Sequence, residues 1–239
     1  MLKKVLEQLK MLGALESLER VKGNAECEAF ALALLQEEQR HREFCAMRKR
    51  LSAAKFPTEK DWSDLNPALN PTIRYQDIQA LTQTDFIAKR ENICLMGQQG
   101  TGKTHSLIAL GRDMCRHGIS TRFYTACGLV TELEEAKIQC RLSKLMKQLM
   151  KPSLLIIDEL GFVPFSQDGV RLLFDVFAGR YERGSIAVST NLSFEKWTQI
   201  FGTSELTGAL LDRFTHHAHV FTFLGESIRF KKAKKNAMS

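Results

Sequence analysis

The sequence lacks any long apolar run. None of its hydrophobic stretches approaches the ~20 residues that a helix needs to cross a bilayer. Its N-terminus, MLKKVLEQLK, is charged throughout and has no continuous apolar core of the kind found in signal peptides. We therefore expect a cytoplasmic protein with no membrane partner.

Paired cysteines are also missing. The six cysteines include no CxxC pair, and several lie within apolar periodic segments. This pattern disfavours a disulfide framework and a metal cluster, so the thiols are expected to be reduced and structural. The histidines of HHAH, 216–219, have no cysteine or carboxylate at ligand spacing, and we expect no metal site there.

Negative charge is in moderate deficit. The 239 residues include 34 Lys and Arg against 27 Asp and Glu, a net charge of +7. This excess permits a nucleic-acid partner without requiring one. One basic cluster falls at steps of three and four within and directly after a predicted helical stretch, 128–150, and would lie near one helix face. Its members are Lys137, Arg141, Lys144, Lys147 and Lys151.

A second basic cluster is the tail RFKKAKK, 229–235, which includes Lys231 and Lys232. Both clusters are open to two interpretations. Such charges usually form a solvated surface, and they can also contact the phosphate backbone of DNA.

Prolines are few, and three of the five fall in FPTEKDWSDLNPALNP. That segment has little periodicity and predicts a linker, 56–74. Before it, apolar residues at helical spacing predict a small helical domain, 1–55, suited to docking or DNA binding. After it we expect a short helix, 75–90, as the start of a main domain, 75–228, followed by a basic tail, 229–239.

Strands and helices alternate in the main domain. The segments NICLM, STRFYTA, LLIID, SIAVST and HVFTFLG predict five strands, with helical patterns between them. Their apolar runs are continuous, which is typical of parallel strands buried on both faces. The sequence thus predicts an α/β fold in which a five-stranded parallel sheet lies between helices.

A glycine-rich turn follows the first predicted strand. Residues 97–104, GQQGTGKT, fit GxxxxGK[ST] between a strand and a helix. Backbone N–H groups of such a loop converge on phosphate oxygens, and the helix N-terminus adds its positive end. The alternative is a tight turn with an incidental lysine, and the order of strand, motif and helix favours phosphate binding. The predicted nucleotide-binding residues are Gly97, Gln98, Gln99, Gly100, Thr101, Gly102, Lys103, Thr104 and His105.

Two carboxylates end the third predicted strand. Asp158 lies at its carboxyl end, where ligands bind in open α/β sheets. We expect Asp158 and Thr104 to hold Mg²⁺ beside ATP. The adjacent Glu159 is suited to activating a water molecule, which favours nucleotide hydrolysis over transfer to a small molecule. A pair of solvated carboxylates is the alternative, and the preceding loop disfavours it.

Two further polar residues are candidates for the reaction. Asn191 follows the fourth predicted strand, where it would position the attacking water or form a cap or turn. Arg213, in LLDRF, would serve as an arginine finger toward a neighbouring subunit or form a surface salt bridge. Spacing alone leaves both pairs of alternatives open.

Together, GQQGTGKTH, LLIIDELGFVP, RYERGSIAVSTN, LLDRFTHHAHV and GESIRF resemble the IstB-like helper ATPases of insertion-sequence transposition. That family belongs to the AAA+ class and is close to the DnaC-type helicase loaders. The resemblance covers nearly the whole chain. It implies a Walker A motif at 97–104, a Walker B motif at Asp158 and Glu159, sensor 1 at Asn191 and an arginine finger at Arg213.

The resemblance has further implications. The helix within 128–150 corresponds to an insertion that faces DNA in relatives. Only residues 192–239 follow Asn191, too few for a full helical lid, so the lid is expected to be minimal or absent. Arg229 is then the candidate for sensor 2. Trp62 and Tyr75 are candidates for approaching the adenine, with packing on the core as the alternative.

Three functional hypotheses follow. The leading one is an ATPase that assembles on DNA with ATP and Mg²⁺, self-associates and hands a target site to a transposase. The second is a replicative helicase loader whose main contact is a helicase. Some loaders carry a cysteine-rich metal module that this sequence lacks. A P-loop phosphotransferase is disfavoured, because such an enzyme would need a substrate lid and would lack an arginine finger such as Arg213.

Overall fold

The computed structural model describes residues 1–18, 20, 23–67, 70, 73–225 and 227. The chain divides into two compact units, Met1–Lys49 and Arg50–Ser239. Among the described residues, no helix is long and apolar enough to span a membrane. Arg229, Lys231 and Lys232 lie outside the described residues, so their predicted roles remain predictions.

The first unit is helical. It contains α1 (Leu2–Gln8), α2 (Leu12–Ser17) and most of α3 (Ala25–Ala54), whose last residues belong to the second unit. Val5, Leu6 and Leu9 are its buried apolar side chains. The expectation of a helical N-terminal region is confirmed.

The second unit is built on a parallel sheet. Its strands are β1 (Asn92–Gly97), β2 (Thr121–Thr125), β3 (Leu154–Leu160), β4 (Ser185–Thr190) and β5 (Ala218–Phe223). They run in the order β2-β3-β4-β1-β5, and every neighbouring pair is parallel. The predicted five-stranded parallel sheet is confirmed. Because the strands are parallel, their carboxyl ends meet at one edge.

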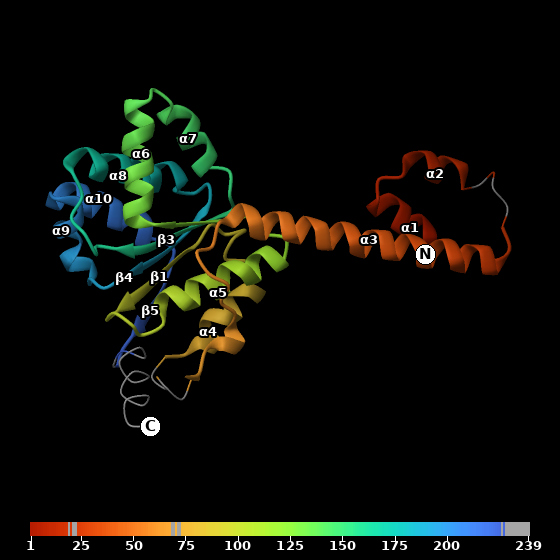
Figure 1. The fold of residues 1–239 in the computed structure, drawn as a ribbon, viewed down its shortest axis with the longest axis horizontal. Coiled ribbons are helices and arrows are strands. Elements are labelled where there is room, and N and C mark those ends of the chain that lie inside the picture. The colour runs from red at the N-terminus through yellow and green to blue at the C-terminus, as the bar shows by residue number, and fades with distance from the viewer. Residues whose placement is uncertain (19, 21–22, 68–69, 71–72, 226, 228–239) are drawn as a thin grey trace. The chain divides into compact units, whose positions relative to one another are not determined.

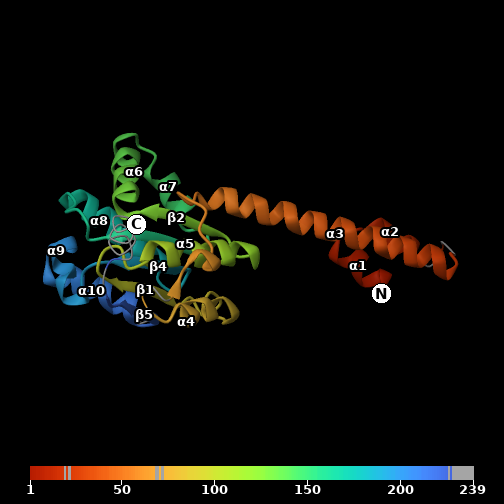
Figure 2. The ribbon, with the colours of Figure 1, turned by 60° about the horizontal axis from the view of Figure 1, so that its bottom comes forward.

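Helices cover both faces of the sheet (Figures 1 and 2). One face packs against α4 (Tyr75–Ala80) and α5 (Lys103–Arg116). The opposite face packs against α6 (Ala126–Ile138), α7 (Leu142–Leu149), α8 (Gln167–Arg180), α9 (Thr198–Phe201) and α10 (Ser204–Thr215). Successive strand residues point to opposite faces of the sheet and pack in the two hydrophobic cores on those faces. Ile156 lies in the core on the α5 side and Ile157 in the core on the α8 side. Continuous apolar strands are the consequence of this two-sided burial.

Two predicted helices differ from the structure. The helix expected over 75–90 ends at Ala80 and passes through a 3₁₀ turn, Leu81–Gln83, into further turns. The hydroxyls of Thr82 and Thr84 donate to carbonyls three residues earlier, which competes with helical hydrogen bonding.

The helical stretch expected over 128–150 is two helices, α6 and α7. Cys140 has a left-handed backbone, with φ of 53°, and the Arg141 N–H bonds to the Ala136 carbonyl at 2.8 Å, which closes the end of α6. The prediction of one continuous helix was therefore wrong. The basic cluster inferred from that helix cannot form a single face.

Candidate functional site

The glycine-rich turn lies at the carboxyl edge of the sheet, between β1 and α5. A Cβ on Gly97 would lie 2.2 Å from the Phe223 carbonyl oxygen, and one on Gly100 would lie 2.1 Å from Ser227 Oγ. Both positions also have φ in the left-handed region, 148° and 74°. The end of β5 thus passes directly beside the loop, and only glycine fits at these two positions.

Lys103 is the first residue of α5 and is only 8% exposed. Its ammonium donates to the carbonyl oxygens of Gly97 and Gln98, at 2.6 Å each. Burial lowers the pKa of Lys103, and the nearby Asp158 and Glu159 oppose that effect. A cation held at the mouth of a loop of backbone N–H groups is suited to binding phosphate.

Asp158 and Thr104 meet across the end of the sheet. The Thr104 hydroxyl donates to Asp158 Oδ1 at 3.1 Å, and Ser189 donates to the same oxygen. Asp158 is 2% exposed, and this burial raises its pKa, although the two hydroxyls oppose the effect. A hydroxyl and a carboxylate at this separation are the hard oxygen ligands that Mg²⁺ prefers, so these residues fit the predicted ion.

Glu159 is exposed beside this buried carboxylate. Its φ of 61° is unusual for a residue with a side chain, and its N–H donates to Ser189 Oγ at 2.9 Å. The two carboxylates therefore occupy different environments: Asp158 is held inside the sheet edge, and Glu159 is accessible to solvent.

Asn191 directly follows β4, which lies between β1 and β3. Its side chain is exposed. The next helical turn, Phe194–Trp197, has Ser193 at its N-cap position, so Asn191 does not cap it. The structure brings Asn191 to the same edge of the sheet as the glycine loop and Asp158.

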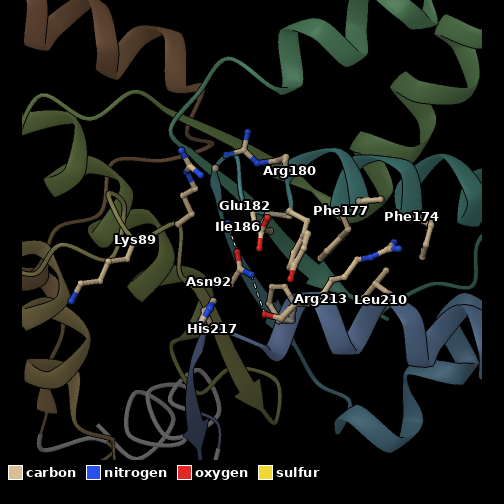
Figure 3. Close-up of a pocket in the computed structure, with 15 residues that line it drawn as sticks. Lys89, Asn92, Phe174, Phe177, Arg180, Glu182, Ile186, Leu210, Arg213 and His217 are labelled. Atoms are coloured by element: carbon tan, nitrogen blue, oxygen red, sulfur yellow. Dashed lines mark hydrogen bonds between the residues drawn. The ribbon is translucent and has the colours of Figure 1, made fainter.

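Arg213 does not join this group. It lies on α10 and lines a cavity of about 240 Å³ at the opposite edge of the sheet (Figure 3). Asn92, the first residue of β1, lines the same cavity and binds the Phe214 carbonyl at 3.0 Å. Since β1 has six residues, the two edges are roughly 17 Å apart. Arg213 therefore does not lie beside the glycine loop of the same chain.

The Arg213 cavity is rich in basic groups. Its lining includes Lys89, Arg90, Arg180, Arg213 and His217, with Glu182 as its carboxylate. Within the described part of the chain, Arg213 forms no salt bridge, and its guanidinium carbon lies 5.7 Å from the centre of the Phe174 ring. The salt-bridge interpretation of Arg213 thus finds no carboxylate partner there.

The predicted adenine residues pack on the core. Tyr75 is 6% exposed, and its hydroxyl lies 3.4 Å from the Thr101 carbonyl oxygen. Trp62 packs against the α5-side core. His105 Nε2 lies 2.9 Å from the Asp61 carbonyl oxygen, so its imidazole contacts the segment before the sheet.

The predicted DNA-binding residues occupy three settings. Lys137 on α6 pairs with Asp168 at 2.8 Å. Arg141 and Lys144 line a small hollow between α6 and α7 together with Glu132. Lys147 and Lys151 are exposed. The single basic face expected from one helix is wrong, because the left-handed backbone at Cys140 reorients α7.

Three contacts between distant residues had no sequence signal. Ser189 binds both residues of the Asp158–Glu159 pair, although it lies inside an apolar strand. Asp61, within the predicted linker, binds Arg112 and Arg116 of α5. His219, from the HHAH segment, lies 2.7 Å from Glu91. All three join residues far apart in the sequence, so spacing could not indicate them.

Comparison with known proteins gives one consistent result. A family model described as IstB-like ATP binding protein matches residues 3–237. A protein named as an ATP-binding protein of insertion sequence IS5376, from Geobacillus stearothermophilus, is 34% identical over 86% of this chain and 82% of its own length. A protein of the same description from insertion sequence IS21 of Pseudomonas aeruginosa is 34% identical over 86% of this chain and 78% of its own.

Solved structures share the fold at lower identity. The crystal structure of DnaI covers 76% of this chain and 93% of its own, with a TM-score of 0.57 and 18% identity. That of the DnaC helicase loader covers 74% of this chain and 99% of its own, with a TM-score of 0.50 and 16% identity. These likenesses support the predicted AAA+ type of P-loop fold.

Proposed function

Because this chain belongs to the family of IstB-like ATP-binding proteins, we propose that it is an ATP-hydrolysing helper of insertion-sequence transposition that assembles on DNA. ATP occupancy holds subunits together on DNA, and hydrolysis regulates delivery of the target site to a transposase. The observation that carries the proposal is the meeting of the phosphate loop with Asp158 and Glu159 at one edge of the sheet.

ATP binds at the glycine loop. Backbone N–H groups of 97–104 and the N-terminus of α5 face the phosphates, and Lys103 exchanges its contacts with Gly97 and Gln98 for phosphate oxygens. Thr104 and Asp158 would hold Mg²⁺, which when bound would neutralise phosphate charge. This arrangement binds the triphosphate and leaves the γ-phosphate toward the exposed Glu159.

Hydrolysis is assigned to Glu159 and Asn191. The Glu159 carboxylate accepts a proton from water as the water oxygen bonds to the γ-phosphorus. The bond from that phosphorus to the bridging oxygen breaks, and ADP and phosphate result. Asn191, exposed at the end of the adjacent β4, orients the water.

Arg213 completes the site of a neighbouring subunit. Its position at the far edge of the sheet prevents a contact within one chain, and its basic cavity suits the anionic nucleotide edge of a second copy. An arginine supplied in this way stabilises charge that develops on the γ-phosphate. Self-association and hydrolysis are thereby coupled.

DNA binding is assigned to the exposed lysines of α7 and its end, Lys144, Lys147 and Lys151, and to the tail at 229–239. These groups present charge without a base-reading pattern, so binding is expected to be largely independent of sequence.

A helicase loader is the second candidate, because the fold resembles that of the DnaC helicase loader over 74% of this chain. The deciding experiment measures ATP-dependent assembly of the protein on plain duplex DNA by sedimentation. Assembly with ATP, and its loss in Lys103→Ala, is the result expected for the transposition helper. Assembly that needs a hexameric helicase and ignores duplex DNA would favour the loader.

A further inference from the structure

Strands β3 and β4 pair in one register as far as Ile157, which faces Val188, and after one irregular step Leu160 faces Thr190. Within that step, Asp158 and Glu159 of β3 lie opposite Ser189 of β4 alone. Two residues facing one define a β-bulge, which bends its strand and redirects the side chains that it carries. The bulge therefore coincides with the two carboxylates to which magnesium binding and water activation are assigned.

Ser189 contacts both residues of the bulge. Its side chain is buried, with the residue only 1% exposed. Its hydroxyl donates to Asp158 Oδ1 and accepts from the Glu159 N–H at 2.9 Å. One oxygen atom thus uses its hydrogen on the carboxylate and a lone pair on the amide.

The N–H group that donates to the Ser189 hydroxyl belongs to Glu159, whose backbone has an unfavourable conformation. Glu159 has φ of 61°, a left-handed backbone that residues with a Cβ rarely adopt. Such conformations persist where surrounding contacts over-determine them. The hydrogen bond from Glu159 to Ser189 is a contact of this kind.

We propose that Ser189 is a positioning residue for ATP hydrolysis, whose hydroxyl holds the β3 bulge in the shape that sets Asp158 against Thr104 and leaves Glu159 exposed. The inference rests on the proposed ATPase function and deepens it. Ser189 is buried and acts through the two carboxylates. Its loss is expected to lower turnover without abolishing nucleotide binding, because the glycine loop and Lys103 do not depend on it.

The test compares Ser189→Ala with Ser185→Ala. Ser185 lies on the same strand, is fully buried, and has no hydrogen-bond partner for its hydroxyl in the described part of the structure. Replacing a residue that hydrogen-bonds a metal ligand typically lowers metal affinity or activity by about 10–100-fold. We therefore expect kcat of Ser189→Ala to fall by about that factor, with KM for ATP nearly unchanged. Ser185→Ala should retain wild-type kcat. Equal kcat in the two variants would overturn the proposal.

A second pair of variants guards against a general packing effect. Threonine and valine have the same shape, and only threonine keeps the hydroxyl. Ser189→Thr should keep most of the turnover that Ser189→Val loses. Equal losses in both would assign the effect to packing at β4 and overturn the proposal.

A binding measurement separates this inference from the ATPase proposal. Mg²⁺ is titrated by calorimetry into each protein loaded with ADP, and Ser189→Ala should bind Mg²⁺ about 10-fold more weakly than Ser185→Ala. If wild type binds Mg²⁺ with ADP but hydrolyses no ATP, the proposed function fails while this difference still supports the role of Ser189. Identical Mg²⁺ affinity in the two variants would overturn that role whatever the turnover.

Discussion

The ammonium of Lys103 lies 2.6 Å from the carbonyl oxygen of Gly97, so the lysine binds the backbone of the glycine loop to which it belongs. Lys103→Ala should weaken ATP binding by at least ~10-fold, because a hydrogen bond to a charged group contributes about 1.5–3 kcal/mol. Titration calorimetry with ATP and Mg²⁺ measures this loss. Lys4→Ala, a change at an exposed lysine of α1, should bind ATP as wild type does, and equal affinity in all three proteins would place the site elsewhere.

Arg213→Ala should leave ATP affinity unchanged and lower kcat by about 10³-fold or more, since an arginine finger acts on the transition state. Mixing Arg213→Ala with Lys103→Ala subunits sharpens the test. The mixture creates interfaces that pair an intact Arg213 with an intact loop on another chain, and some activity should return. Absence of recovery at every mixing ratio would contradict action between subunits.

Asp61 predicts a pH dependence of stability. Burial favours a raised pKa for Asp61, but hydrogen bonds and charges from Arg112 and Arg116 outweigh burial and lower the pKa. A carboxyl whose pKa is lower in the folded state stabilises the fold at pH values above its unfolded pKa, near 3.8. That contribution is lost as the pH falls through the pKa of the folded state.

The measurement is Tm between pH 6 and pH 3. Asp61→Asn should lower the free energy of unfolding by about 1–3 kcal/mol at pH 6. Its Tm should approach that of wild type as the pH nears 3. Asp168→Asn is the control, because the Asp168 pair with Lys137 is exposed and screened by solvent. Parallel curves for wild type and Asp61→Asn would show that the Asp61 charge makes no pH-dependent contribution to stability.

Exposed lysines on and after α7 predict salt-sensitive DNA binding. Replacing Lys144, Lys147 and Lys151 by glutamine should reduce the slope of log K against log salt by about 0.9 for each DNA phosphate that is no longer neutralised. Lys137→Gln should change the slope less, because Lys137 already pairs with Asp168. An unchanged slope in the triple variant would leave these lysines as solvated surface.

Local signals explain which parts of the site could be predicted. The glycine loop and the Asp158–Glu159 pair are each contained within a few residues at the end of a strand, so the sequence alone predicted their place at the carboxyl edge of the sheet. The parallel sheet followed from continuous apolar strands. Ser189 could not be predicted, because its role depends on two residues of β3 facing one of β4.

The same reasoning explains the main error. Helical spacing over 128–150 presumed an unbroken helix, and the left-handed backbone at Cys140 ends it. Residues other than glycine can adopt that conformation at a helix end. No glycine or proline therefore marked the boundary between α6 and α7. The distance between Arg213 and the glycine loop was likewise a property of the folded sheet.

The central claim is that hydrolysis at Glu159 releases the protein from DNA. Glu159→Gln keeps the size of the side chain and a hydrogen bond but cannot accept a proton from water, so ATP binding should survive while turnover stops. The measurement is the dissociation rate of labelled duplex after a competitor chase with ATP and Mg²⁺ present. Glu159→Gln should remain on DNA far longer than wild type or the exposed control Glu195→Gln. Dissociation of Glu159→Gln at the wild-type rate would contradict the account.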